Sequence, residues 1–132
     1  MFTISQIKEA HSKVKSGADF PRYINDITAL GVTAYSTYVS DGHTDYKGSN
    51  NYTTSSDARY AALIIADKSN IELFKQYLKS HQQGQSDYPT FCKQSAETGV
   101  EKWVVDMAAM TCTYYDKAGN KMLEEIIPAL TT

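Results

Sequence analysis

Four aromatic residues in two pairs of short segments are the strongest candidates for a binding site. Tyr35 and Trp103 lie in apolar segments typical of β-strands, in which alternate side chains share one face of a sheet. Tyr46 and Tyr114 fall in the segments expected to form the neighbouring strands. Aromatic side chains with a few hydroxyl groups are typical of small-molecule cavities. The same residues also fit a packed core in which each polar tip has a partner.

One carboxylate lies close to this aromatic group in the sequence. Asp106 is flanked by Val105 and Met107, so it is either a carboxylate at the edge of a pocket or a surface residue. Strand alternation places it on the face opposite Trp103. Paired-carboxylate catalysis needs a second carboxylate at a set distance, and no such distance follows from the sequence. We therefore assign no catalytic residue, and the speculative ligand-binding set is Tyr35, Tyr46, Trp103, Tyr114 and Asp106.

The other reactive side chains have simpler interpretations. Cys92 and Cys112 lack a CxxC or zinc spacing, and we expect reduced, partly buried thiols. Residues 41–45 (DGHTD) lack the calcium-loop pattern, which favours a polar turn over a metal site. His11 and His81 lie on apolar helix faces and are expected to pack rather than to act as ligands. We expect no metal and no cofactor; whether the chain is an enzyme stays open, and the sequence favours a non-enzymatic role.

Composition narrows the class of protein. The chain has 132 residues, of which 42% are hydrophobic and 21% are charged, and this is ordinary for one soluble globular domain over 1–132. The net charge of −2 and the lack of a basic run argue against nucleic acid as a partner. The longest apolar run, 61–66, is too short to span a membrane. The N-terminus lacks the apolar core of a signal peptide, so we expect a cytoplasmic protein.

Helix starts and stops are readable in both halves of the chain. Capping-box spacing occurs at Thr3 with Gln6 and at Ser69 with Glu72, and an aspartate precedes a first-turn proline at Asp19 and Asp87. Glycines that favour helix termination follow at Gly17, Gly31, Gly84 and Gly99. These signals predict helices over about 3–17, 19–31, 69–84 and 87–99.

The strands are predicted from β-branched and aromatic content and from turn residues. The expected strands are 32–40, 43–47, 60–65, 100–107, 111–116 and 121–127. Asp41-Gly42 is a strong hairpin signal. Residues 48–57 are expected to form a polar loop around Tyr52, of a length typical of functional or mobile loops.

The two halves resemble each other. Tyr35 and Trp103 are 68 residues apart, and the same offset relates Gly31-Val32 to Gly99-Val100 and Tyr46 to Tyr114. We expect an internal duplication with pseudo-repeats at about 1–66 and 67–132; the alternative is convergence of two ordinary helix-to-strand transitions. A helix–helix–strand–strand–strand unit is too small to bury its apolar face alone. The predicted class is therefore α+β, with one or two antiparallel sheets and helices packed on one side.

Several segments carry a resemblance to a known family. They are Phe91-Cys92, Gly99-Val100-Glu101-Lys102-Trp103, Asp106, residues 110–116 and Gly119. The chain resembles the YdfO-like family (domain of unknown function 1398) of small bacterial and prophage-encoded proteins, some of which are labelled phage envelope proteins. The resemblance implies an α+β fold and no established activity, and it provides no catalytic residues.

Two hypotheses about function remain. The first is a non-enzymatic binding or protein-interaction module, with a homodimer as the simplest partner, because tyrosine is enriched at interfaces and catalytic signatures are lacking. The alternative is a small-molecule-binding protein or modest enzyme with an aromatic-lined cavity at the repeat junction. The two hypotheses predict different structures, because only the small-molecule alternative requires a cavity beside Trp103. A nucleic-acid role is suggested only by the prophage origin of proteins in the resembling family, and the net negative charge of the chain argues against it.

Overall fold

The computed structural model describes residues 2–14 and 19–127, and its elements form two successive helix–helix–strand–strand–strand units. The first unit contains α1 (Ile4–His11), α2 (Phe20–Leu30), β1 (Val32–Tyr38), β2 (Thr44–Gly48) and β3 (Thr53–Ser55). The second contains α3 (Ile71–Gln82), α4 (Tyr88–Glu97), β4 (Val100–Asp106), β5 (Thr111–Asp116) and β6 (Lys121–Ile126). The predicted α+β class is confirmed. Within these described ranges, no helix is long and apolar enough to cross a bilayer.

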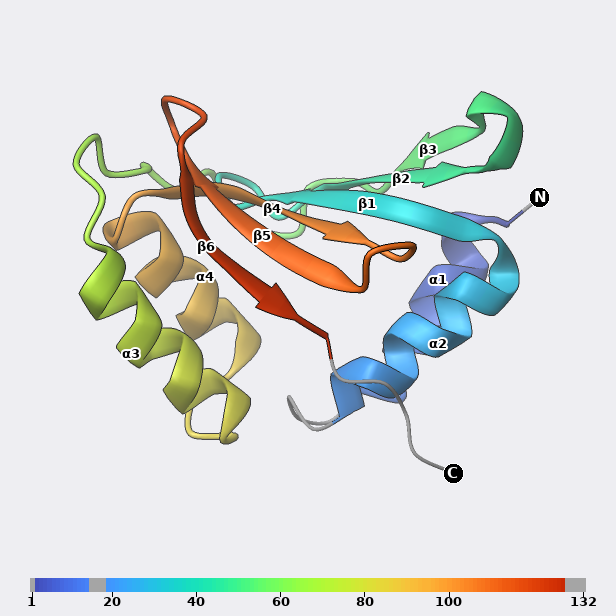
Figure 1. Ribbon diagram of the computed structural model, residues 1–132, viewed down its shortest axis with the longest axis horizontal. Helices are drawn as coiled ribbons and strands as arrows, with labels where there is room; N and C mark the ends of the chain where they lie inside the picture. The colour runs from blue at the N-terminus through green and yellow to red at the C-terminus, as the bar shows by residue number, and fades with distance from the viewer. Residues whose placement is uncertain (1, 15–18, 128–132) are drawn as a thin grey trace.

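All strands belong to one antiparallel sheet in the order β3-β2-β1-β4-β5-β6. The first strand of each unit therefore lies at the centre, where β1 pairs with β4. Figure 1 shows both helix pairs on the same side of the sheet, α1 and α2 under one half and α3 and α4 under the other. The prediction of helices on one side is confirmed. The core lies between the sheet and the helices.

The strand register repeats with the 68-residue offset of the sequence. Tyr35 pairs with Tyr46 between β1 and β2, and Trp103 pairs with Tyr114 between β4 and β5. The register shifts after Val32 in the first unit and after Val100 in the second, again 68 residues apart. Ser36 pairs with Val104 at the centre, and these two residues are also separated by 68.

A pseudo-two-fold axis therefore passes through the Ser36–Val104 pair. The hydrogen bond from Val39 N–H to Glu101 O (3.0 Å) has its counterpart in the bond from Met107 N–H to Thr33 O (3.1 Å). Such an axis is perpendicular to the sheet, so it keeps the helices of both units on the same face. The geometry supports a duplication, which itself stays a prediction.

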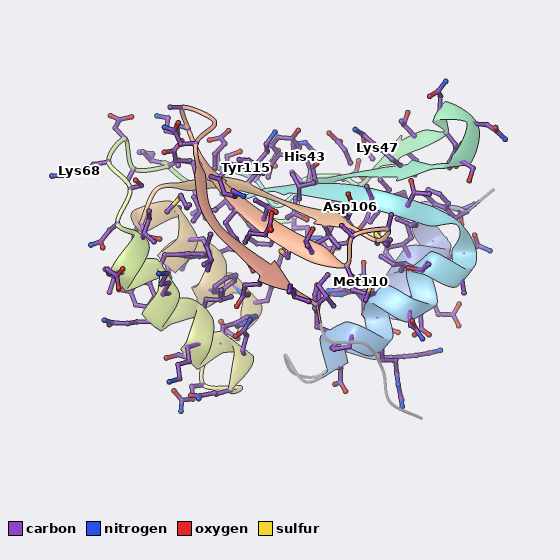
Figure 2. All side chains as sticks on the ribbon, in the orientation of Figure 1. His43, Lys47, Lys68, Asp106, Met110 and Tyr115 are labelled. Carbon is purple, nitrogen blue, oxygen red and sulfur yellow. The ribbon has the colours of Figure 1, made fainter. Side chains whose placement is uncertain are left out.

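The open face of the sheet carries a row of polar and aromatic side chains. The Lys102 ammonium group lies 5.8 Å from the ring centre of Tyr38 and 5.7 Å from that of Tyr115. The Tyr38 ring also stacks on His43, with centroids 4.6 Å apart. His43 and Tyr115 lie on the side away from the helices (Figure 2). Some of the ten tyrosines therefore form a partly exposed cross-strand row rather than core.

The helix starts agree with the sequence in part. The Thr3–Gln6 capping box is present, with Gln6 N–H donating to Thr3 Oγ1 at 3.2 Å. The predicted capping box at Ser69 is wrong, because Asn70 is the cap of α3 and its Oδ1 accepts from Leu73 N–H at 3.1 Å. The backbone of Asn70 is bonded to Thr98 O, which places its side chain at the helix start.

Helix ends show one difference from the expected boundaries. Helix α1 ends at His11, several residues before the expected stop. Gly17, which was expected to end it, lies outside the described residues. Helix α2 ends at Gly31, whose φ of 111° is the left-handed conformation expected of a terminating glycine.

The third strand of the first unit was predicted in the wrong place. The expected strand over 60–65 is an irregular segment, and the strand lies at Thr53–Ser55 inside the expected loop. Asn50 and Asn51 adopt positive φ values of 58° and 61° in the connection from β2, a conformation that asparagine tolerates. Burial explains only part of this apolar run, because Ile65 is 6% exposed whereas Ile64 is 92% exposed.

Tyr52 is a packing residue within this connection. Its hydroxyl donates to Phe2 O at 2.7 Å, and its ring meets the Phe2 ring edge-on at 4.8 Å. The centre of the expected loop is therefore attached to the N-terminal segment.

Two glycines give a test of the packing between the segment before α3 and the α4–β4 junction. Gly99 (φ 93°) and Gly119 (φ 86°) both adopt left-handed conformations, but a Cβ on Gly99 would lie 2.8 Å from Ser69 Cα, whereas Gly119 has open space. We expect Gly119→Ala to cost about 1 kcal/mol of unfolding free energy and Gly99→Ala about 2–4 kcal/mol, since the backbone of Ser69 must move. Chemical denaturation of both variants measures the difference. Equal losses would contradict the close packing at Gly99.

Candidate functional site

A cavity of 810 Å³ lies between the two helix pairs beneath the centre of the sheet. We call it the central cavity. Its lining comes from β1, β2, β4, β5 and β6 and from the four helices of the described residues. The four predicted aromatic residues all line it: Tyr35, Tyr46, Trp103 and Tyr114. Trp103 therefore has a cavity beside it, which the small-molecule hypothesis required.

The sheet forms an aromatic surface on one side of this cavity. The rings of Tyr35 and Tyr46 are 5.6 Å apart, and those of Trp103 and Tyr114 are 6.0 Å apart. These are equivalent cross-strand pairs, one from each unit. Burial raises the pKa of Tyr35 and of Tyr114 well above 10, so both hydroxyl groups stay protonated. They offer neutral hydrogen-bond donors among apolar rings.

The two halves of this surface differ in polarity. Thr37 and Thr44 line the cavity and share a buried hydrogen bond of 2.9 Å between their hydroxyl groups. The equivalent cross-strand pair in the second unit is Val105 and Cys112. The cavity is thus bordered by the hydroxyl groups of Thr37 and Thr44 on one side of the axis and by the Cys112 thiol on the other.

Both cysteines are buried and free. Burial raises the pKa of the Cys112 thiol to about 12, and burial also raises the pKa of Cys92. Neutral thiols are weak nucleophiles. The expectation of reduced, partly buried thiols agrees with this placement.

The helices contribute two half-buried histidines to the cavity wall. The His11 ring meets Tyr23 edge-on at 5.3 Å, and the His81 ring stacks on Phe91 at 4.4 Å. The Nδ1–H group of His81 donates a hydrogen bond of 3.1 Å to Ser86 O. Burial lowers the pKa of both histidines below 6.5. Both rings pack as the sequence indicated, and they also border the cavity.

Two polar residues lie at the edge of the cavity, and the first of them, Arg59, was missed in the sequence. Arg59 is an exposed residue of the irregular segment after β3, and its side chain lines the cavity. Glu125 also lines it and accepts a hydrogen bond of 3.0 Å from Gln82 Nε2. An arginine in an irregular segment has no periodic pattern, so nothing in the sequence indicated the role of Arg59.

The structure does not bring Asp106 together with the four aromatic residues. Asp106 is exposed at the end of β4, near the turn that contains Met110 (Figure 2). Its Oδ1 accepts from the N–H groups of Ala108 (2.9 Å) and Ala109 (3.1 Å). Alternation along β4 places it on the face opposite Trp103, which lines the cavity. Its carboxylate stabilises the β4–β5 turn.

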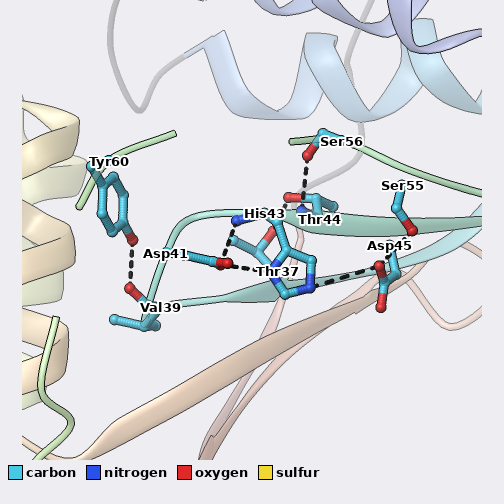
Figure 3. A network of polar contacts seen from close by, with 9 residues as sticks. All are labelled: Thr37, Val39, Asp41, His43, Thr44, Asp45, Ser55, Ser56 and Tyr60. Carbon is cyan, nitrogen blue, oxygen red and sulfur yellow. Dashed lines mark hydrogen bonds and ion pairs between the residues drawn. The ribbon is translucent and has the colours of Figure 1, made fainter. Parts of the chain in front are cut away.

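The DGHTD segment forms a polar turn (Figure 3). Asp41 Oδ1 accepts from the backbone N–H of His43 at 3.0 Å and lies 2.5 Å from its Nδ1, while Nε2 lies 3.8 Å from Asp45 Oδ1. The hydrogen bonds from the backbone and ring of His43 lower the pKa of Asp41. Among the described residues, no group of three or more histidine, cysteine, aspartate or glutamate side chains could hold a metal ion.

The fold and cavity define an α+β protein with two similar halves around an aromatic-lined space. The chain belongs to the family described as "Protein of unknown function (DUF1398)", whose model matches residues 8–126 and so includes both units. The expected resemblance to domain of unknown function 1398 is therefore confirmed. A search of the curated proteins found no match.

The two cavity histidines predict a pH-dependent stability. Because burial lowers their pKa in the folded state, the unfolded chain binds protons first as the pH falls. The stability that the two neutral histidines contribute is fully present above the pKa that they have in the unfolded chain. It is lost as the pH falls from there through their lower pKa in the folded state. We expect the double variant His11→Leu/His81→Val to lose less stability than the wild type between about pH 7 and pH 5. It exchanges each histidine for the residue found 67 positions away in the other unit, Leu78 for His11 and Val14 for His81. Denaturation midpoints across this range provide the measurement, and parallel curves would contradict it.

Proposed function

We propose that this protein is a non-enzymatic binding protein that holds a small organic molecule in the central cavity. The observation that carries the proposal is the cavity itself, with 810 Å³ bordered by two equivalent aromatic pairs. This volume falls within the range of about 300–1,000 Å³ typical of ligand pockets. Aromatic walls with isolated hydroxyl groups favour a ligand with a flat ring system and one or two polar groups.

The state of the reactive side chains supports binding rather than catalysis. The Cys112 thiol is protonated at neutral pH, because its pKa is about 12. The two histidines are packed against aromatic rings, and one ring nitrogen of His81 is engaged with Ser86. None of these groups is arranged as a nucleophile activated by a neighbouring base.

The cavity favours the small-molecule alternative over a protein-interaction module. The small-molecule function accounts for the equivalent placement of Tyr35 and Trp103 beside one space, which an interaction surface would not require. Self-association, a cytoplasmic location and a prophage origin with the YdfO-like name stay predictions.

The single tryptophan gives a direct test. Trp103 is the only tryptophan of the chain, so its indole N–H gives one isolated NMR signal from the cavity wall. We expect titration with 2-naphthamide, a neutral flat probe, to shift this signal saturably. The Val14→Phe variant places a ring in the cavity from the turn that follows α1. It should weaken binding of the probe by roughly tenfold or more.

The matched control is Leu30→Phe, because Leu30 is a half-buried aliphatic residue of α2 that does not line the cavity. This variant should bind the probe like the wild type, and thermal unfolding verifies that both variants are folded. An indole signal that does not move at any probe concentration, or equal binding by Val14→Phe, would refute cavity binding.

A further inference from the structure

A second, smaller space adjoins the central cavity. This side pocket has a volume of 330 Å³ and is lined by the segment 59–63 and by the first turns of α4. Arg59 and Tyr88 line both spaces, so these side chains form the boundary between them. A ligand that extends past them would occupy both.

The side pocket has an unbalanced charge. Arg59 and Lys93 line it, and no acidic side chain does. Neither cation has a side-chain hydrogen bond or ion pair with another described residue. The side pocket therefore combines two cations with no acidic side chain among the described residues that line it.

Two acidic groups beside this pocket have other hydrogen-bond partners. The Asp87 carboxylate accepts from Thr90 N–H at 2.8 Å as the cap of α4, and the charge of Lys93 helps to lower its pKa without an ion pair between the two groups. The Asp41 carboxylate is bonded to His43, and its backbone carbonyl accepts from Arg59 N–H at 2.8 Å. Neither carboxylate forms an ion pair with Arg59 or Lys93, so both cations can bind an anionic ligand.

The charge of Arg59 also acts inside the central cavity. It lowers the pKa of His11 in addition to the larger effect of burial, and it partly offsets the effect of burial on the pKa of Tyr23. Its positive potential thus reaches the helix wall of the cavity. An anion near Arg59 would be bound at the edge of a low-dielectric space, where charge-assisted hydrogen bonds are strong.

We propose that the ligand is an organic anion, whose acidic group binds Arg59 and Lys93 in the side pocket while its flat body occupies the central cavity. This inference rests on the proposed function and specifies the ligand class. Arginine suits the role because its planar guanidinium group donates two parallel hydrogen bonds to a carboxylate or phosphate group. Tyr60 and Tyr88 provide aromatic walls around the acidic group.

Two probes of the same shape test the charge requirement. Calorimetry compares 2-naphthoate with 2-naphthamide, which differ in charge. We expect the wild type to bind naphthoate roughly tenfold more tightly than the amide, as for a hydrogen bond to a charged group. Arg59→Met and Lys93→Met should each bring the ratio of naphthoate affinity to amide affinity close to one, because each removes one of the two charges that face the side pocket.

The control variant is Arg22→Met, an exposed arginine of α2 that lines neither space. It should retain the preference for naphthoate. Equal binding of the two probes by the wild type, or an equal loss in Arg22→Met and Arg59→Met, would overturn the anion site and leave cavity binding intact. Failure of both probes to bind the wild type would overturn the proposed function itself, so the two failures are distinguishable.

Discussion

The antiparallel pairing of β1 with β4 is the constraint on which the rest of the structure depends. Each unit has only three strands and two helices, which cannot form a stable core alone. Pairing about Ser36 and Val104 joins the two meanders into one sheet and keeps both helix pairs on the same face. The helix pairs lie under opposite halves, so the space beneath the centre must be filled by large side chains from the sheet or left as a cavity (Figure 1).

The aromatic residues fill this central space only in part. Tyr35 and Trp103 stand one step from the axis on equivalent strands, and both are almost fully buried. Their rings cover the sheet side and leave 810 Å³ between the helices. The hydroxyl groups of Thr37 and Thr44 satisfy each other, so the polar side of the cavity is stable without a ligand.

Sequence patterns predicted the parts of the site that depend on regular structure. Strand alternation and the 68-residue offset correctly placed the four aromatic residues on one face and on neighbouring strands. The strand at 53–55 was missed because three residues in a run of serine, threonine and asparagine have no periodicity, while the apolar run at 60–65 has strand-like composition without a strand partner. Arg59 was missed because its position depends on the path of an irregular segment.

The irregular segment between β3 and α3 determines which end of the cavity is positively charged. The Tyr60 hydroxyl donates to Val39 O at 2.6 Å, which attaches the segment to the β1–β2 connection (Figure 3). Leu63 N–H donates to Ser40 O at 2.6 Å, and Ala66 N–H donates to Ala96 O of α4 at 2.9 Å. This anchored irregular path passes beside α4 and brings Arg59 to the junction of the two spaces. The two-fold arrangement thus provides a nearly symmetric cavity, and the connection between the units makes one end of it cationic.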